Sequence, residues 1–374
     1  MKKVPLMAWY FPNWHPDSRN DEWHGKGWTE WECTKCARPR FPGHEQPKVP
    51  LWGYEDESDP TVMAKKIDTA LQYGIDGFLW DMYWFEDGSY RLNALDKGFF
   101  GAKNNEKFKI ALMWCNHDPI YVHPASRRFV RPALLPGELS PEAFRRGSDY
   151  FIQNYFWRPN YLRIDGKVFF VIWDLDKLIK NYGGLNGTRL IFDDFRKRVA
   201  DAGLGELYLA CEGTHVEGFN KKDRDTYNHI LKAVGIDGTV RYSWPLQPYH
   251  FPDIAYDDYM ANGIRTFGED TALNDQPTSI TISTGWDVSP RTVQSEMYED
   301  IGYPFSPVVT NNTPDKFETA LRAAKAFADS DQFTGDLIAL STWNEWTEGN
   351  YLEPSTQYGY QHLEAVRRVF GAGK

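Results

Sequence analysis

The residues of this 374-residue chain best suited to chemistry are two glutamates in the segment STWNEWTEG, residues 341–349. Glu345 and Glu348 are three positions apart, so one helical turn would project both carboxyls from the same face. Cleavage of a glycosidic bond needs an acid at the departing oxygen and a second group that stabilises or captures the anomeric carbon. Two carboxylates can divide these tasks, because burial and mutual repulsion separate their pKa values. Glutamates at this spacing are equally compatible with a helix start, where the helix dipole favours negative charge.

The elements that must position this pair follow a simple alternation. Short apolar segments alternate with amphipathic stretches, a pattern typical of parallel strands joined by helices. Strands are predicted at residues 6–10, 77–80, 109–113, 168–173, 206–210, 238–242, 280–283 and 337–341. Helices are predicted between them, including residues 60–73, 141–157, 189–202, 223–234, 314–328 and 358–370.

Eight such strands predict an α/β protein with the (β/α)8 TIM-barrel fold. We expect a single catalytic domain over residues 1–374, with a long first βα loop at about residues 11–59. An open, doubly wound sheet would show the same local pattern with fewer strands.

Barrel active sites lie at the C-terminal ends of the strands, and in this sequence polar and aromatic side chains gather at those positions. Aromatic rings stack on the apolar faces of sugars, while carboxylates, amides and imidazoles pair with hydroxyls. Structural roles, such as caps or satisfied core histidines, compete with this interpretation for each residue. Trp31 lies in the long first loop, and we include it because that loop is long enough to cover the site. The residues predicted to contact substrate are Tyr10, His15, Trp31, Asp81, Tyr83, Trp84, Trp114, Asn116, His117, Glu212, Trp244, Trp286, Asp287, Trp343, Asn344 and Trp346.

Composition narrows the classes of partner. The 15 Trp, 21 Tyr and 23 Phe residues are more than packing alone explains, and they suit a carbohydrate ligand. A formal charge of −10 repels phosphate backbones, so we expect no nucleic-acid partner. No apolar run is long enough for a membrane span. No signal peptide is visible, which predicts a cytoplasmic protein, although a chain that had lost an export signal, and was periplasmic or secreted, would look the same.

The four cysteines do not predict a metal or redox centre. Cys33 and Cys36 form an isolated C-x-x-C, and no second cysteine pair or close histidine pair completes a zinc site. A thioredoxin-like context for a redox motif is also missing. We therefore expect two loop thiols, and neither a metal nor an organic cofactor.

Several segments resemble one known family. They are WYFPNWHP (9–16), NDEWHGKGWTEW (20–31), RPRFPGHEQPKVP (38–50), YGIDGFLWDMYWF (73–85), TGWDVSPR (284–291) and STWNEWTEGNYLEP (341–354). This combination is similar to the WbsX-type glycosyl-processing proteins, which belong with the glycoside hydrolase family 99-like barrels. The last segment is the strongest signature.

The resemblance implies catalytic roles for the two glutamates. In family 99 endo-α-mannosidases, the residue matching Glu345 takes a proton from the sugar's own 2-hydroxyl, which attacks the anomeric carbon. The residue matching Glu348 acts as acid and then as base, and configuration is retained. The 2-hydroxyl must lie anti to the leaving group, so an α-mannoside-like or α-rhamnoside-like bond in an oligosaccharide or polysaccharide is expected. This sequence departs from related chains after the third strand, where it has Trp114-Cys115-Asn116-His117-Asp118, so one sugar subsite is expected to differ.

Two other functions compete with hydrolysis. The WbsX name comes from polysaccharide-assembly loci, which suggests a glycosyltransferase, and Asp174-Leu175-Asp176 fits an Asp-x-Asp metal motif by spacing. No nucleotide-binding domain is otherwise indicated, which favours hydrolysis. A non-catalytic glycan-binding barrel would be expected to lack one glutamate of the pair, and both are present. Neither the natural glycan, the choice between endo and exo action, nor the oligomeric state follows from the sequence.

Overall fold

The predicted apolar segments form the strands of a closed barrel. In the computed structural model, which describes residues 4–129 and 131–371, its strands are β1 (Leu6–Tyr10), β2 (Gly77–Phe85), β4 (Lys109–Trp114), β6 (Lys167–Ile172), β7 (Leu207–Glu212), β8 (Gly238–Val240), β10 (Thr278–Ser283) and β12 (Ile338–Ser341). All neighbours pair in parallel and in chain order, and β1 pairs with both β2 and β12. The (β/α)8 prediction is therefore confirmed.

The strands read as continuous apolar runs because both of their faces are covered. Helices pack against the outside, and side chains from all strands fill the inside. In β6, Val168 to Ile172 are each at most 2% exposed. The register that closes the barrel pairs Leu6 with Ile338 and Ala8 with Phe78.

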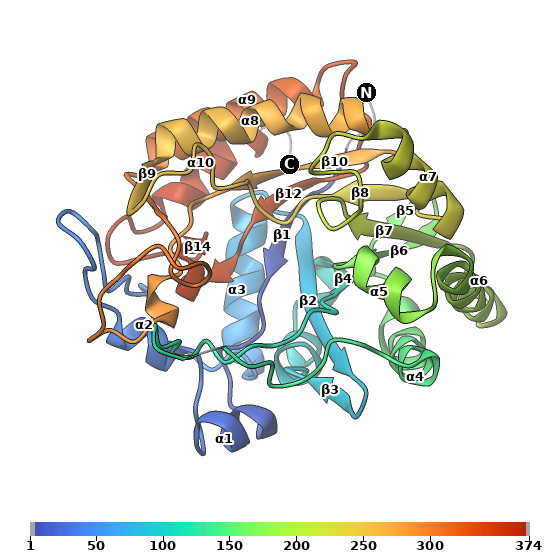
Figure 1. Ribbon diagram of the computed structural model, residues 1–374, viewed down its shortest axis with the longest axis horizontal. Coiled ribbons are helices and arrows are strands. Elements are labelled where there is room, and N and C mark those ends of the chain that lie inside the picture. Colours follow the sequence, from blue (N-terminus) through green and yellow to red (C-terminus); the bar gives the residue numbers. More distant parts are fainter. Residues whose placement is uncertain (1–3, 130, 372–374) are drawn as a thin grey trace.

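The outer layer consists of helices that follow the strands (Figure 1). They are α3 (Pro60–Gln72), α4 (Pro141–Phe151) continued by η3 (Ile152–Phe156), α5 (Leu175–Asn181), α6 (Leu185–Asp201), α7 (Arg224–Val234), α8 (Tyr256–Leu273), α9 (Pro314–Ala328) and α10 (Gln361–Phe370). Helix α3 begins as predicted, because the Asp59 side chain accepts a hydrogen bond from the Thr61 amide and Pro60 occupies the first turn. The 18-residue helix α8 was not among the predicted helices.

The loops contain short elements of their own. The long first loop holds α1 (Ser18–His24) and α2 (Trp31–Cys36), so it is partly structured. The remaining short elements are β3 (Gly88–Tyr90), η1 (Ala94–Phe99), η2 (Asn105–Lys107), β5 (Arg163–Ile164), β9 (Asp253–Ala255), η4 (Ser289–Arg291), β11 (Val308–Thr310), β13 (Asn344–Glu345), η5 (Trp346–Glu348) and β14 (Asn350–Tyr351). None of the helices in the described residues has the length and apolar character needed to cross a bilayer.

Candidate active site

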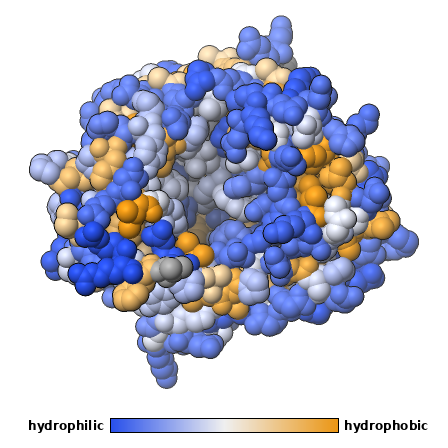
Figure 2. All heavy atoms as spheres, in the orientation of Figure 1, coloured by the Kyte–Doolittle hydropathy of each residue, from blue (hydrophilic) through white to orange (hydrophobic). Residues whose placement is uncertain are grey.

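A cavity of about 560 Å³ opens at the C-terminal ends of the barrel strands. Figure 2 shows the molecule hollowed near the middle of the face it presents. Every barrel strand contributes to the wall through its last residues or the loop that follows. Representatives in strand order are Phe11, Asp81, Cys115, Trp173, Glu212, Tyr242, Trp286 and Glu345. The cavity therefore lies where (β/α)8 barrels place their active sites.

The two glutamates of the last βα loop both reach this cavity. Glu345 ends β13, and Glu348 ends the 3-10 turn η5 that follows it directly. Gly349 then reverses the chain at φ 59°, and a Cβ atom there would lie 2.5 Å from that of Asp287. Only glycine fits this turn, because the approach is too close for a side chain. The tight hairpin of β13 and β14 thus holds both carboxyls on one wall.

Arg291 joins the pair electrostatically. Its Nη2 atom lies 3.3 Å from Glu345 Oε1, and its Nη1 atom donates to Glu348 Oε1. The same guanidinium donates from Nε to Glu30 Oε1 at 2.9 Å, and the Tyr303 hydroxyl donates to Glu348 at 3.0 Å. One cation therefore serves three buried carboxyl groups, and their charges are only partly compensated.

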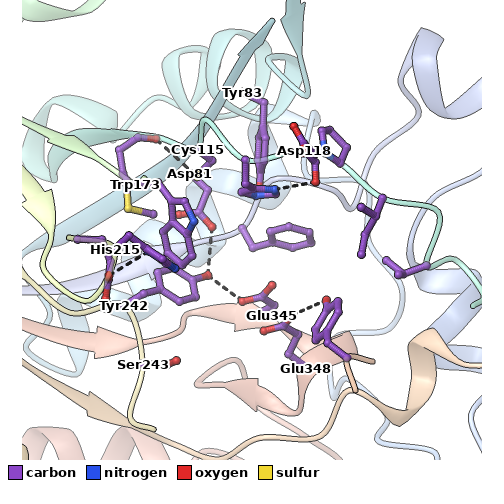
Figure 3. Close-up of a pocket in the computed structure, with 18 of the residues that line it drawn as sticks. Asp81, Tyr83, Cys115, Asp118, Trp173, His215, Tyr242, Ser243, Glu345 and Glu348 are labelled. Atoms are coloured by element: carbon purple, nitrogen blue, oxygen red, sulfur yellow. Dashed lines mark hydrogen bonds and ion pairs between the residues drawn. The ribbon is translucent and has the colours of Figure 1, made fainter. Parts of the chain in front are cut away.

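Tyr242 connects Glu345 to a third carboxyl group of the cavity. Its hydroxyl oxygen lies 2.7 Å from Glu345 Oε2 and 3.1 Å from Asp81 Oδ2, and Figure 3 shows both contacts as dashed lines from this hydroxyl. A phenol has one proton and can donate to only one of them. The second contact is a hydrogen bond only if Asp81 or Glu345 carries a proton. The three residues form a network that holds at least one exchangeable proton beside the cavity.

Burial sets the protonation of the pair. Burial, and then the charge of Glu348, raise the pKa of Glu345 well above its usual value, although Arg291 acts in the opposite direction. Burial also raises the pKa of Glu348, but Arg291 and Tyr303 contact it and limit the rise. Burial raises the pKa of Asp81 well above its usual range as well. These shifts favour the protonated form of the carboxyls, which is the form that a general acid needs.

Glu212 behaves differently from the pair. Burial alone would raise the pKa of Glu212, but its hydrogen bond and attraction to His215 outweigh burial and lower it. Its carboxylate also accepts the Thr214 amide at 2.8 Å and the Tyr242 amide at 3.2 Å. Glu212 therefore stays charged, which suits a hydrogen-bond acceptor and disfavours a role as acid.

The structure brings eight of the predicted residues to the cavity wall. Besides the two glutamates and Glu212, these are Asp81, Tyr83, His117, Trp244 and Trp286. They come from β2, β4, β7, β8, β10 and β12 or from the loops that follow, so the predicted convergence of strand ends holds for them.

The remaining predicted contacts do not line this cavity, and several pack below it. Tyr10 donates to Glu57 at 2.8 Å, and His15 Nδ1 lies 3.1 Å from the same carboxyl. Asn344 bonds to the backbone of Phe11 in both directions at 2.9 Å. Trp343 is fully buried with its ring 5.2 Å from that of Phe78. These side chains hold the first and last strands together.

Other predicted contacts point outward or into loops. Trp114 stacks on Phe144 of α4 with ring centroids 4.8 Å apart, and the Trp84 ring lies 5.4 Å from that of Tyr150. Four more side chains are engaged away from the cavity by other partners. Asn116 bonds to the Asp174 backbone, Trp31 packs on Trp14, Trp346 stacks on Tyr351, and Asp287 bonds to His44 and Gln46 at a smaller cavity of about 280 Å³.

Several wall residues were missing from the predicted set. Trp173 and Tyr242 end predicted strands and His215 follows one, so their positions in the sequence indicate this end of the barrel. Arg291 belongs to a segment that resembles the family, but the sequence does not show which carboxylates it meets. Others come from loops without any strand-end signal; they are His24, Arg91, His123 and Tyr303.

The C-x-x-C pair does not contribute to the cavity. Both thiols are free, with Cys33 buried and Cys36 exposed. Within residues 4–129 and 131–371, no group of three or more His, Cys, Asp or Glu side chains is arranged to hold a metal ion.

Fold and cavity together define a (β/α)8 barrel with a cluster of buried carboxyl groups at the C-terminal ends of its strands. Residues 6–366 match the family described as "Glycosyltransferase WbsX", and the chain belongs to that family. It is 26% identical over 380 residues to the uncharacterized protein WxcX of Xanthomonas campestris pv. campestris strain B100. That alignment covers 97% of this chain and 49% of WxcX, so the chain spans about half the length of the curated relatives it matches.

Solved structures with the same fold include glycoside hydrolases. The GH99 endo-alpha-mannosidase from Bacteroides thetaiotaomicron is 14% identical with a TM-score of 0.56, and the match covers 98% of this chain and 96% of that one. A "glycoside hydrolase-like protein" is 16% identical with a TM-score of 0.57, over 99% and 94% of the two chains. These similarities agree with the family 99-like barrel that the sequence resembles.

Proposed function

We propose that this protein is a retaining glycoside hydrolase that cleaves α-mannoside-like or α-rhamnoside-like bonds in an oligosaccharide or polysaccharide. One observation carries the proposal: Glu345 and Glu348 are both buried, both face one cavity, and both contact Arg291. The fold shared with an endo-alpha-mannosidase supports it. A non-catalytic glycan-binding barrel would have no use for two adjacent carboxyls with raised pKa values.

The reaction follows from the roles that the family resemblance implies. Glu345 removes the proton of the sugar 2-hydroxyl, and the resulting oxygen attacks the anomeric carbon while the glycosidic bond breaks. Glu348 gives its proton to the departing oxygen. Glu348 then takes a proton from water, which opens the anhydro sugar at the anomeric carbon, and Glu345 returns the proton to the 2-oxygen. Two carboxyls on one loop suit this course, because neither has to reach the anomeric carbon itself.

The free protein favours the opposite placement of the proton. Arg291 contacts Glu348 more closely than Glu345, so Glu348 is the more easily charged of the two. A substrate that draws Arg291 away from Glu348 would remove this preference. The assignment of base and acid therefore needs a test that separates the two residues.

Aryl α-mannosides and α-rhamnosides with good and poor leaving groups provide that test. In Glu348→Gln, a dinitrophenyl leaving group needs no proton, so the first step should keep most of its rate while poor leaving groups lose about 10²–10⁴-fold. In Glu345→Gln, both kinds of substrate should lose activity alike. The reverse result would exchange the roles. Undiminished turnover of 2-deoxy substrates, or full activity in both variants, would contradict the proposal.

The family description favours one competing function, glycosyl transfer. The Asp-x-Asp motif does not support it. The Asp174 side chain caps α5 by accepting the Lys177 amide at 2.8 Å, Asp176 accepts the Glu217 amide at 3.0 Å, and neither lines the cavity. Release of reducing sugar from α-mannosides, α-rhamnosides or bacterial surface polysaccharides without added nucleotide sugar would favour hydrolysis. Product that forms only with a nucleotide sugar and an acceptor would favour transfer.

A further inference from the structure

Arg91 is a cavity-lining cation that the proposed reaction does not use. It follows β3, the strand that folds back on the extended end of β2, and it is only 7% exposed. Its backbone adopts a left-handed conformation with φ 63°, which is strained for a residue with a side chain. The Arg91 amide donates to Asp17 Oδ2 at 3.1 Å, and the Tyr90 hydroxyl donates to Asn20 at 2.6 Å. The hairpin and α1 thus fix this arginine at the wall.

The guanidinium of Arg91 makes no ion-pair contact with a carboxylate in the described part of the chain. Among the residues that the structure describes, no Asp or Glu lies within ion-pair distance of its guanidinium, and its buried Nε atom has no hydrogen-bond acceptor. Its neighbours are aromatic: the rings of Tyr90, Tyr83 and Phe11 lie 4.4, 4.6 and 4.9 Å from its guanidinium carbon. These rings and the Tyr90 hydroxyl stabilise the cation, and the charge of Glu30 acts on it without an ion-pair contact.

The other arginines of the cavity differ in this respect. Arg241 forms a bidentate pair with Asp270, in which Nε donates to Oδ2 and Nη2 donates to Oδ1, both at 3.0 Å. Arg291 is shared by Glu30, Glu345 and Glu348. A buried and uncompensated arginine is uncommon, because removing its charge from water is unfavourable unless a partner is supplied. At Arg91, a ligand bound in the cavity can supply that partner.

The location of Arg91 places such a partner beside the reacting sugar. The ring of Phe11 lies 4.9 Å from the Arg91 guanidinium and 5.5 Å from that of Arg291, which holds the catalytic pair. One aromatic ring therefore separates the two cations. A group bound at Arg91 belongs to the reacting sugar or to its direct neighbour in the glycan.

The surroundings favour a single, planar negative charge. Burial lowers the pKa of His24 and of His117 to about 4, and it lowers the pKa of His123 as well, so these cavity histidines are neutral at pH 7. Arg91 is therefore the cation of this wall whose guanidinium makes no ion pair with a carboxylate among the described residues. A guanidinium fork matches the two oxygens of a carboxylate, whereas a phosphate dianion generally recruits further cations.

We propose that the natural substrate is an acidic glycan, and that Arg91 binds a carboxylate, such as that of a uronic acid, next to the cleaved bond. This inference rests on the proposed function for the identity of the site, but it concerns recognition and not bond cleavage. It assigns Arg91 a role in selecting the substrate.

Binding measurements on a cleavage-deficient background test it. The intact Glu345→Gln protein would be titrated calorimetrically with oligomannuronate, oligogalacturonate and hyaluronan oligosaccharides, and with the same oligosaccharides after reduction of their carboxyls to alcohols. We expect at least one acidic oligosaccharide to bind about ten- to a hundredfold more tightly than its reduced form. Adding Arg91→Gln should abolish that preference, and Arg91→Lys should restore part of it.

A matched control and a phosphate arm sharpen the result. Neutralising the paired arginine, in Arg241→Gln/Asp270→Asn, should leave the preference for the acidic form in place, and thermal melting would identify any variant that fails to fold. Equal binding of every acidic and reduced pair, or a preference that survives Arg91→Gln, would overturn the proposal. Tighter binding of mannose 6-phosphate than of mannuronate would overturn the carboxylate assignment. These binding measurements need no turnover. The proposal about Arg91 can therefore fail while the proposed hydrolysis is confirmed, and the proposed hydrolysis can fail while the proposal about Arg91 is confirmed.

Discussion

At the scale of single residues, the site depends on how protons are shared among buried acids. Tyr242 is central because its hydroxyl contacts both Glu345 and Asp81. Burial and the surrounding carboxylates raise the pKa of the Tyr242 phenol well above its usual value, so it stays protonated and can donate throughout the working pH range. Its hydrogen bond lowers the pKa of Glu345 and so opposes the effect of burial.

Tyr242→Phe should therefore shift the pH dependence of catalysis. Without the hydroxyl, the pKa of Glu345 rises further, so a base at this position is ionised only at higher pH. The ascending limb of the kcat/KM profile should move to higher pH, and the maximum should fall about tenfold through loss of a charge-assisted hydrogen bond. Steady-state kinetics across the pH range measure both effects. Tyr256→Phe removes a buried hydroxyl that bonds to the Ser283 backbone, and it should leave the limb in place; a limb unmoved in Tyr242→Phe would contradict this account.

Residue chemistry was also where sequence reasoning had the clearest limit. The spacing of Glu345 and Glu348 and their position after the last strand were enough to predict that the two carboxyls lie together at one site. The tryptophans beside them, Trp343 and Trp346, are buried instead, where Trp343 packs near Phe78 and Trp346 stacks on Tyr351. Position at a strand end is readable from a sequence, but the side to which each side chain turns depends on register and packing.

At the scale of elements, helix α8, which is one of the helices that the sequence did not predict, supports one wall of the site. Helix α8 contains Gly263 and Gly268, lacks a side-chain cap at its start, and follows a loop rich in proline and aromatic residues, so it has few helix signals. Glycine is required at position 263 because another element packs closely against it. A Cβ atom there would lie 2.1 Å from the ring of Trp244, which lines the cavity.

Gly263→Ala should consequently act on the cavity through Trp244. The added methyl has no room, so the indole must move, and overpacking should cost about 1–3 kcal/mol of unfolding free energy. Because the moved ring alters the cavity wall, we expect a higher KM with a smaller change in kcat. Gly268→Ala in the same helix meets nothing within 4 Å and should stabilise the protein by about 0.5–1 kcal/mol without a change in KM. Chemical denaturation and kinetics on both variants decide the matter, and equal behaviour of the two would refute the packing argument.

At the scale of the whole molecule, the loop that carries Glu345 and Glu348 is attached to the seam between β1 and β12, where the barrel closes. Strand β1 pairs with β12, and the Trp343 amide donates to the Trp9 carbonyl at 2.7 Å. Eight strands in the right order could be predicted from the alternation of apolar segments. The hydrogen bonds between Asn344 and the Phe11 backbone could not be predicted, because they join residues 333 positions apart. The sequence therefore favours a substrate contact for Asn344 over this structural role.

Asn344 is the side chain that secures this seam. It accepts from the Phe11 amide and donates to the Phe11 carbonyl, both at 2.9 Å, and all three groups are buried. Asn344→Ala leaves two buried backbone groups unpaired, which should lower the free energy of unfolding by about 2–5 kcal/mol. The Phe11 amide should also exchange with solvent faster than the amides of the preceding strand β1, because the seam opens locally. Activity should fall as well, since Glu345 is the next residue.

The matched control for the seam is Asn228→Ala. Asn228 also bridges distant backbone groups, accepting the Asp275 amide at 2.7 Å and donating to the Leu273 carbonyl at 2.9 Å, but it lies on α7 outside the cavity wall. Its loss should cost stability without faster exchange at Phe11 and without lower activity. Urea denaturation and hydrogen exchange resolved by mass spectrometry separate the two cases. If Asn344→Ala left exchange at Phe11 unchanged, the barrel would be closed by its backbone pairing alone, and the catalytic loop would owe its position to the β13–β14 hairpin and to Arg291.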